Sequence, residues 1–256
     1  MPVALITGAA LRIGRQIACT LAAHKWDIAV HYHQSQASAQ ELVAELQAMG
    51  VQAQAFCADL SAEPACRGLI PQVVETLGSV SALVNNASQF LDDQASTFTY
   101  AMLDMHMRAN TAPAIVLAQV LHAHIKAQQE AQRSNVQGVV VNLLDQKLWN
   151  LNPDHFSYTL SKAALHTATD LMARSFAPYI RVVGIAPGLT LPSAHMTPEQ
   201  FEELHQLSPL GQSSTLQDIA QAVHFAVSNR ALTGTSLLVD GGQHLMNFSR
   251  DFSKLI

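Results

Sequence analysis

The stretch YTLSK places a tyrosine and a lysine at a spacing that suits acid–base chemistry. Tyr158 and Lys162 are four positions apart, so a helix presents both side chains on one face. A free tyrosine has a pKa of about 10 and is a poor acid at neutral pH, but a neighbouring ammonium group stabilises the phenolate and lowers that pKa. This pair is a candidate proton donor, although the same spacing also arises by chance.

A glycine-rich loop near the amino terminus is a candidate phosphate-binding site. The residues TGAALRIGR at 7–15 follow the apolar run VALI and open a helical pattern. Glycine lets the backbone approach a pyrophosphate, whose negative charge then faces the helix N-terminus. Gly8 and Gly14 fit this motif, and Arg12 stands where a third glycine is expected. This context predicts a dinucleotide site.

The residues after the second predicted strand indicate which dinucleotide binds. NAD-binding proteins commonly carry an acid there for the ribose 2′-hydroxyl, whereas this chain reads HYHQSQAS. Arg12, His33, Gln34 and Ser35 can instead donate hydrogen bonds to a 2′-phosphate, which predicts NADPH. The alternative, that Arg12 is a plain surface arginine, leaves a cation opposing the helix dipole.

The rest of the sequence alternates short β-branched runs with helical patterns, which is typical of βαβ units around a parallel sheet. Strands are expected at VALI from 3, DIAVHY from 27, VQAQAF from 51, SALVNN from 81, GVVVNLL from 138, IRVVGIAP from 180 and TSLLVD from 235. Helices are expected at about 12–24, 36–49, 62–77, 98–128, 156–177 and 215–229. We therefore predict that residues 1–256 form a single α/β domain, a doubly wound parallel sheet of Rossmann type with helices on both faces.

Two segments depart from this alternation. Residues 125–137 are polar and are expected to form a helix end and an exposed connection. Residues 190–210 follow a strand end and contain a short amphipathic helix that begins near Thr197 and Pro198. An insertion at the carboxyl edge of a parallel sheet commonly covers the ligand crevice, so we expect a substrate lid there, with a packed surface helix as the alternative.

Composition excludes several classes of function. The chain is 49% hydrophobic and only 13% charged, with a formal net charge of −5, which argues against nucleic-acid binding. No apolar run reaches membrane-spanning length. Cys19, Cys57 and Cys66 lack zinc or CxxC spacing, and His31 and His33 have no suitably spaced ligand nearby, so we expect no metal. Unpaired cysteines fit a reducing compartment, and we expect a soluble cytoplasmic protein.

Taken together, the motifs resemble the short-chain dehydrogenase/reductase family across essentially the whole chain. They are TGAALRIGR, the Asp59-Leu60 pair, NNAS at 85–88, Asn110, YTLSK, IAPG at 185–188 and DGG at 240–242. The resemblance implies that Tyr158 exchanges the proton, that Lys162 lowers its pKa and holds a ribose, and that Asn110 supports a water-linked proton path. It also implies a homotetramer.

The same resemblance assigns the cofactor residues. Asp59 is expected near the adenine and Asn86 near the adenine ribose side of the site. The full expected set is Gly8, Arg12, Ile13, Gly14, His33, Gln34, Ser35, Asp59, Leu60, Asn86, Ala87, Ser88, Tyr158, Lys162, Pro187 and Gly188.

One departure from the family pattern bears on the substrate. The family usually has a serine thirteen positions before the tyrosine to hold a substrate carbonyl, but this chain has Asp145 there. An ionised aspartate only accepts hydrogen bonds, so it suits a substrate with N–H groups or proton delivery to nitrogen. An aspartate here and an arginine in the glycine loop resemble the pteridine reductases and the related bacterial dihydromonapterin and dihydrofolate reductases. That subgroup implies substrate contacts by Ser88 and Phe90, together with Arg12, Asp145 and Tyr158.

These features predict an NADPH-dependent reductase of a pterin-type substrate, with Asp145, Tyr158, Lys162 and Asn110 as catalytic residues. Gln34 replaces an arginine frequent in the subgroup, and Phe90 has the alternative of a loop residue packed into the core. Two rival functions remain open. One is an NADPH-dependent carbonyl or 3-oxoacyl reductase, and the other is a non-catalytic NADPH-binding protein.

Overall fold

A single parallel sheet organises the protein. The computed structural model describes residues 1–131, 137–192 and 196–255, and within them seven strands pair in the order β3-β2-β1-β4-β5-β6-β7, every pair parallel. The strands are β1 Val3–Ile6, β2 Asp27–Tyr32, β3 Ala53–Cys57, β4 Val80–Asn85, β5 Gly138–Leu143, β6 Ile180–Pro187 and β7 Thr235–Val239. The predicted doubly wound sheet is confirmed.

The central strands are mostly apolar, and β1 is apolar throughout, because both of their faces are covered. In β1, Ala4 and Ile6 join one hydrophobic cluster, while Val3 and Leu5 join the cluster on the opposite face. This period of two is the geometry of a strand, and apolar residues at every position are expected where helices cover both sides.

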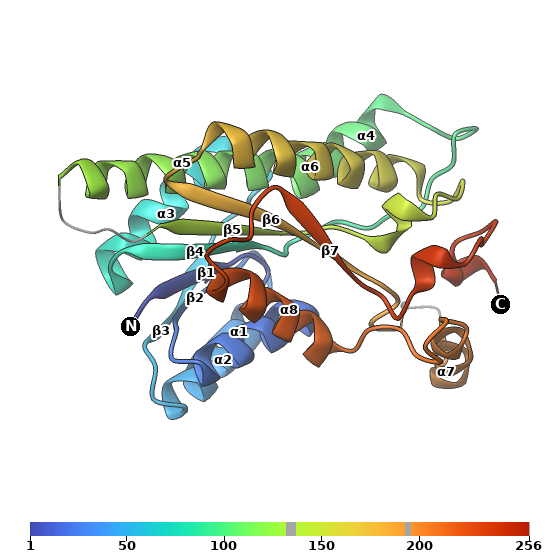
Figure 1. Ribbon diagram of the computed structural model, residues 1–256, viewed down its shortest axis with the longest axis horizontal. Coiled ribbons are helices and arrows are strands. Elements are labelled where there is room, and N and C mark those ends of the chain that lie inside the picture. Colours follow the sequence, from blue (N-terminus) through green and yellow to red (C-terminus); the bar gives the residue numbers. More distant parts are fainter. Residues whose placement is uncertain (132–136, 193–195, 256) are drawn as a thin grey trace.

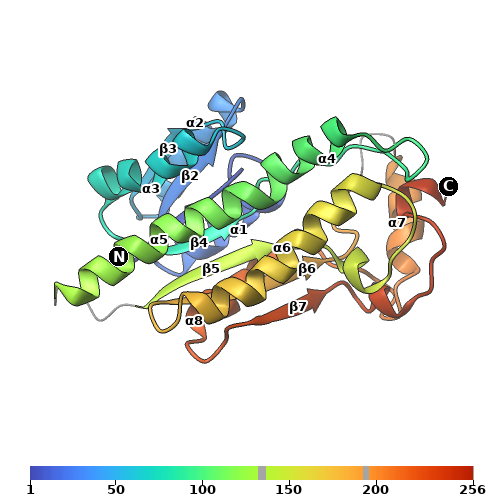
Figure 2. The same cartoon turned by 90° about the horizontal axis from the view of Figure 1, so that it is seen from above.

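Helices form a layer on each side of the sheet (Figures 1 and 2). One layer holds α1 Arg12–Ala23, α2 Gln36–Ala48 and α8 Leu216–Ser228, and the other holds α3 Glu63–Leu77, α5 Ala112–Glu130 and α6 Phe156–Ser175. Apart from the helix predicted over 98–128, each predicted helix in these layers is confirmed to within a few residues. None of the helices in the described part of the chain is long and apolar enough to cross a membrane.

The single helix predicted over 98–128 is interrupted in the structure. It consists of α4 Tyr100–His106, a π-helical turn Met107–Thr111 and α5 Ala112–Glu130. Apolar periodicity is nearly the same for α and π geometry over one turn, so the pattern did not reveal the interruption. Single π turns are frequent at functional sites, and this one carries Asn110.

The strand order reverses beside β1, where β1 connects to β2 on one side and pairs with β4 on the other. In open parallel sheets, ligands bind at the carboxyl ends of the strands at such a switch point. The α4 region, α7 and the carboxyl-terminal segment all gather at this end of the sheet (Figure 1).

The predicted helix at 197–198 is also confirmed. Helix α7 spans Pro198–Gln206, and Thr197 forms a capping box with Gln200 that fixes its start. Of the two segments singled out from the sequence, residues 132–136 and 193–195 lie outside the described residues.

Candidate active site

Two pockets lie side by side at the carboxyl ends of the strands, and Ser88 lines both. The first, called here the Tyr158 pocket, has a volume of about 300 Å³. Of the expected site residues it contains Arg12, Ile13, Asn86, Ser88, Phe90, Asp145, Tyr158, Lys162, Pro187 and Gly188. The second, the His33 pocket, has a volume of about 860 Å³ and contains Gly8, His33, Gln34, Ser35, Asp59, Leu60, Ala87 and Ser88.

The glycine loop is held in place by its own backbone and by β4. Gly8 has φ +62°, and a Cβ on Gly14 would lie 2.4 Å from the Gly8 carbonyl oxygen, so both positions require glycine. The Asn86 amide donates to the carbonyls of Thr7 and Gly8. Asn86 therefore positions the loop and lines the Tyr158 pocket, and its expected place near the adenine ribose stays a prediction.

Arg12 occupies an unusual backbone conformation at the start of α1. Its φ of 54° lies in the left-handed region, which disfavours side chains other than glycine by about 1 kcal/mol or more. The side chain is exposed and lines the Tyr158 pocket, whereas His33, Gln34 and Ser35 line the other. The four residues expected to meet one 2′-phosphate thus line two adjoining pockets, and their common contact with that phosphate stays a prediction.

His31 is a buried support beneath the glycine loop. Its Nδ1 accepts a hydrogen bond from the Gly8 N–H at 3.0 Å, and its Nε2 lies 3.1 Å from the Ala58 carbonyl oxygen. These partners require the neutral tautomer with the proton on Nε2. Burial lowers the pKa of His31 from 6.5 to about 4. The ring therefore joins β1, β2 and β3 as a neutral group.

This arrangement predicts an acid-sensitive contribution to stability. Above pH 6.5 the imidazole is neutral in both states, but below that value the unfolded chain binds a proton that the folded chain takes up only near pH 4. The free energy of unfolding should therefore fall by about 3 kcal/mol over this range because of His31. His31→Gln is the matched control, since an amide can accept from Gly8 and donate to Ala58 without titrating. Urea unfolding from pH 4 to 7 should show a shallower decline for this variant, and equal slopes would contradict the assignment.

Tyr158 and Asp145 form a direct hydrogen bond. The Tyr158 hydroxyl donates to Asp145 Oδ2 at 2.8 Å, while the other carboxylate oxygen accepts from the Lys147 N–H at 2.8 Å. Asp145 caps the 3₁₀ turn Gln146–Trp149 after β5, and Tyr158 lies in the first turn of α6. The two elements thus bring a carboxylate and a phenol together at the edge of one pocket.

Burial dominates the acid–base properties of these groups. It raises the pKa of Asp145 above its ordinary value, and burial together with the Asp145 carboxylate raises the pKa of Tyr158 well above 10. Burial also lowers the pKa of Lys162 to about 8. The Lys162 ammonium donates to the Leu143 carbonyl at 2.7 Å and lies 5.8 Å from the tyrosine ring centroid, and its expected lowering of the Tyr158 pKa stays a prediction.

Asn110 connects the π turn to the loop after β4. Its amide nitrogen donates to the Gln89 carbonyl and to Ser161 Oγ, and its amide oxygen accepts from Ser88 Oγ and the Gln89 N–H. An asparagine amide has two donors and two acceptor positions, so these four bonds use its capacity. Asn110 thus positions Ser88 and α6, and its expected support of a water-linked proton path stays a prediction.

Phe90 lies at the mouth of the Tyr158 pocket. It is 46% exposed, so it is not packed into the core. Its ring centroid lies 4.6 Å from that of Tyr158 in an edge-on arrangement and 4.2 Å from that of His155. This places an aromatic face beside the phenol, at a position where a flat ring can stack.

Sequence reasoning missed several residues of the Tyr158 pocket. Leu189, Thr190, Leu191 and Met196 belong to the segment expected as a lid or just precede it, but no individual contact was predicted for them. Asp251 and Phe252 come from the carboxyl-terminal segment, which is far from Tyr158 along the chain and has no motif. In the His33 pocket, Arg108 was likewise missed, because it lies in the π turn that the sequence did not predict.

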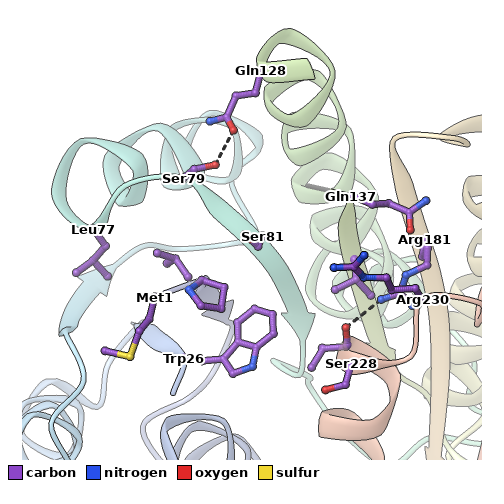
Figure 3. A pocket seen from close by; sticks show the side chains of 14 residues that line it. Met1, Trp26, Leu77, Ser79, Ser81, Gln128, Gln137, Arg181, Ser228 and Arg230 are labelled. Atoms are coloured by element: carbon purple, nitrogen blue, oxygen red, sulfur yellow. Dashed lines mark hydrogen bonds between the residues drawn. The ribbon is translucent and has the colours of Figure 1, made fainter. Parts of the chain in front are cut away.

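A further cavity lies at the opposite, amino end of the strands and is larger, at about 1170 Å³ (Figure 3). Met1, Trp26 and Arg230 contribute to its wall. Arg181 also lines it, but its guanidinium donates to three carbonyls at the ends of α8 and the following loop. Among the described residues that line this cavity there is no acid, tyrosine or lysine, so it offers no acid–base chemistry.

The described residues contain no group of three or more histidine, cysteine, aspartate or glutamate side chains arranged to hold a metal ion. The three cysteines are unpaired.

Comparison with known proteins gives consistent similarities. The model of the family described as enoyl-(acyl carrier protein) reductase matches residues 8–244. An uncharacterized oxidoreductase of Bacillus subtilis, YmfI, is 31% identical over 251 residues, covering 94% of this chain and 98% of that protein. The 3-oxoacyl-[acyl-carrier-protein] reductase FabG of Staphylococcus aureus is 31% identical over 249 residues, with the same coverage.

Two solved structures are similar over nearly the whole chain. FolM alternative dihydrofolate reductase 1 from Brucella canis, complexed with NADP, has 36% identity and a TM-score of 0.87, covering 96% of this chain and 95% of that one. The Brucella suis protein of the same name, also in complex with NADP, has 36% identity and a TM-score of 0.86, covering 96% of each chain.

Proposed function

Because this chain belongs to the short-chain dehydrogenase/reductase family, we propose that it is an NADPH-dependent reductase acting on a C=N bond of a dihydropterin or dihydrofolate. The observation that carries this proposal is the hydrogen bond from Tyr158 to Asp145, where a carboxylate takes the usual place of a serine. The NADP complexes of the two Brucella dihydrofolate reductases support the same substrate class and cofactor.

The two pockets fit the cofactor. The His33 pocket has donors and no acid directly after β2, which suits an adenosine 2′-phosphate, and the glycine loop offers backbone approach to the pyrophosphate. In this assignment Asp59 faces the adenine, while its carboxylate already accepts from the N–H and Oγ of Ser61. The nicotinamide half then enters the Tyr158 pocket, beside Lys162, Pro187 and Gly188.

When bound, NADPH supplies the hydride to the ring carbon of the substrate C=N bond. Tyr158 gives its phenolic proton to the ring nitrogen, and the Asp145 carboxylate, which accepts from that hydroxyl, then takes up a proton from solvent and passes it back to the phenolate. The raised pKa of Asp145 makes this transfer easier, since a buried carboxyl group holds a proton at higher pH. Lys162 balances the charge left on the pair, and Asn110 holds Ser88 in position.

Asp145 distinguishes this reaction from carbonyl reduction. A serine hydroxyl can donate to a carbonyl oxygen, but an ionised carboxylate cannot and repels the oxyanion that develops during hydride transfer. A ring with N–H groups instead offers donors to the carboxylate. Phe90 provides an aromatic face for such a flat ring at the pocket mouth.

Removing the Arg12 side chain should weaken binding without weakening the fold. Arg12→Gly relieves the left-handed backbone at φ 54° and removes a cation from the Tyr158 pocket. A hydrogen bond to a charged group contributes roughly 1.5–3 kcal/mol, so we expect the KM of NADPH or of the dihydropterin to rise by about tenfold or more, with an unchanged or higher Tm.

Arg15→Gln is the control for this variant, because Arg15 pairs with Glu45 on the surface and lines neither pocket. We expect its kinetic constants to stay within about twofold of the wild type. Unchanged KM values in Arg12→Gly would remove Arg12 from both ligands.

We also propose that residues 190–210 act as the substrate lid over a single domain. Thr190, Leu191 and Met196 already line the Tyr158 pocket, and the capping box at Thr197 gives α7 a fixed start. A lid that excludes water protects the hydride-transfer step from side reactions.

The working form is proposed to be a cytoplasmic homotetramer, as in the family. Exposed apolar residues on α6, Leu160 and Leu171, give such an assembly apolar surface to bury, and the unpaired cysteines fit a reducing compartment. Light scattering of the purified protein should give four times the 27.6 kDa of one chain.

A second candidate function is reduction of a 3-oxoacyl thioester, which the matched family model and the FabG relatives favour. A panel assay separates the two. NADPH oxidation, with NADH as the control, is measured against 7,8-dihydrobiopterin, dihydromonapterin, dihydrofolate, a 3-oxoacyl thioester and small ketones. Turnover of a pterin or folate supports the proposal, and turnover confined to the thioester or ketones overturns it. Absence of any turnover would favour a non-catalytic NADPH-binding protein.

A further inference from the structure

The carboxyl-terminal segment forms part of the wall of the Tyr158 pocket. Asp251 and Phe252 line it, and Phe252 begins a short 3₁₀ turn, Phe252–Lys254. This segment runs along the end of the molecule where α7 and the strand ends gather (Figure 1, red). The pocket is therefore closed on one side by residues of the same chain.

Ion pairs fasten this segment to residues that flank the catalytic groups. Arg250 donates two hydrogen bonds of 2.8 Å to the Asp154 carboxylate, and the Asp251 N–H donates to the same carboxylate at 2.8 Å. Lys254 donates to Asp92 at 2.7 Å. Asp154 precedes α6 and Asp92 follows Phe90, so the segment is tied to both sides of the pocket mouth. Of the three charged tail residues, only Asp251 lines the pocket.

The Asp251 side chain stands between two basic groups and the cavity. Its Oδ2 lies 3.3 Å from Lys147 Nζ and its Oδ1 lies 3.7 Å from His155 Nε2. Lys147 is buried, and its ammonium also donates to the Asp154 carbonyl. These groups hold the carboxylate in one orientation, and a carboxylate can accept about four hydrogen bonds, so a further donor from the cavity is compatible with them.

The pocket thus contains two carboxylates, Asp145 and Asp251, with different partners. Asp145 is engaged by the Tyr158 hydroxyl and the Lys147 N–H, which suits it to proton transfer. Asp251 comes from the carboxyl-terminal segment and pairs with Lys147 and His155. A planar ring that carries an amino group beside a ring N–H presents two parallel donors, which match the two oxygens of a carboxylate.

We propose that Asp251 is a specificity residue that accepts hydrogen bonds from the amino-substituted, N–H-bearing edge of the substrate ring. This inference rests on the proposed reductase function and adds the residue that binds the 2-amino group of the pterin ring. The carboxyl-terminal segment then contributes to substrate choice as well as to closing the pocket. A substrate with an oxo group in place of that amino group places its oxygen against an Asp251 carboxylate oxygen. Both atoms are acceptors, so no hydrogen bond forms and the substrate binds more weakly.

Asp251→Asn tests this assignment with two substrates. The wild-type enzyme should prefer a 7,8-dihydropterin over the matching 7,8-dihydrolumazine, which has an oxo group in place of the 2-amino group. In Asp251→Asn, one acceptor becomes a donor, so the ratio of kcat/KM for the two substrates should fall by about tenfold or more. The change should lie mainly in KM, with the Kd of NADPH within about twofold of the wild type.

Arg250→Gln and Lys254→Gln control for a purely structural role. Each weakens the fastening of the segment but neither residue lines the pocket. If Asp251 only fastens the segment, these variants shift the substrate ratio as Asp251→Asn does, or none of them shifts it, and either result overturns the inference.

The same inference is checked by binding, which separates its failure from failure of the proposed function. Calorimetric titration of the enzyme–NADP⁺ complex with the dihydropterin should show a weaker Kd in Asp251→Asn than in the wild type. Pterin turnover by the wild type with an unchanged ratio and Kd in the variant would overturn the role of Asp251 alone. A wild type that neither binds nor reduces pterins would overturn both.

Discussion

Asp145→Asn is expected to lower kcat for a dihydropterin by about a hundredfold or more while leaving the Kd of NADPH within about twofold. The asparagine oxygen can still accept from the Lys147 N–H, so the turn after β5 keeps its cap. What is lost is a carboxylate that accepts from Tyr158 and can relay a proton to it, with a pKa that burial raises. Loss of a positioned general acid typically costs a factor of about 100 to 10,000. Single-turnover rates with saturating NADPH measure the change.

Asp145→Ser is the informative companion, because it restores the residue that the family usually has at this position. We expect it to lose pterin turnover as well, and to gain activity toward small ketones, since the serine hydroxyl can donate to a carbonyl oxygen. Full pterin turnover in either variant would remove Asp145 from the mechanism.

Tyr158→Phe is expected to have the other large effect, a fall in kcat of about 1,000-fold. The substitution removes the hydroxyl that reaches the substrate and leaves the buried Asp145 carboxylate without its 2.8 Å donor. Removing one partner of a buried pair is costly, so Tm should fall and the pKa of Asp145 should rise further. Stopped-flow measurement of NADPH oxidation should show the loss, together with a reduced solvent deuterium isotope effect.

Tyr179→Phe is the matched control, because Tyr179 lies just before β6 at the amino end of the sheet and lines neither pocket. It should keep wild-type kinetics. Tyr158→Phe activity within about tenfold of the wild type would mean that the proton reaches the substrate by another route.

The fold was predictable because its signals are local. Short apolar runs such as VALI and GVVVNLL alternate with helical patterns and indicate buried strands. Gly8 and Gly14 indicate a close approach of backbone segments that only glycine allows. The Tyr158 and Lys162 pair was likewise readable from one helical turn. The π turn at Met107–Thr111 could not be predicted, because apolar periodicity is nearly the same for α and π geometry over one turn.

The parts of the site that were missed depend on contacts between distant segments. Asp251 lies at the Tyr158 pocket in a segment held by pairs between distant residues, such as Arg250 with Asp154 and Lys254 with Asp92, which nothing in the local sequence indicates. Arg12 was expected to serve both the cofactor and the substrate, and its side chain lines the Tyr158 pocket, so its contacts with either ligand stay a prediction. The raised pKa of Tyr158 follows from burial beside that carboxylate, which spacing alone cannot show.

The most direct test of the account follows the hydride. The enzyme is given NADPH that carries two deuterium atoms at nicotinamide C4 and a 7,8-dihydropterin under anaerobic conditions, and the product is analysed by mass spectrometry and NMR. The account predicts a tetrahydropterin that carries one deuterium at C6, the carbon of the reduced C=N bond, in an amount equal to the NADPH consumed. Oxidation of NADPH without deuterium in the pterin, or transfer only to a ketone or 3-oxoacyl substrate, would contradict it.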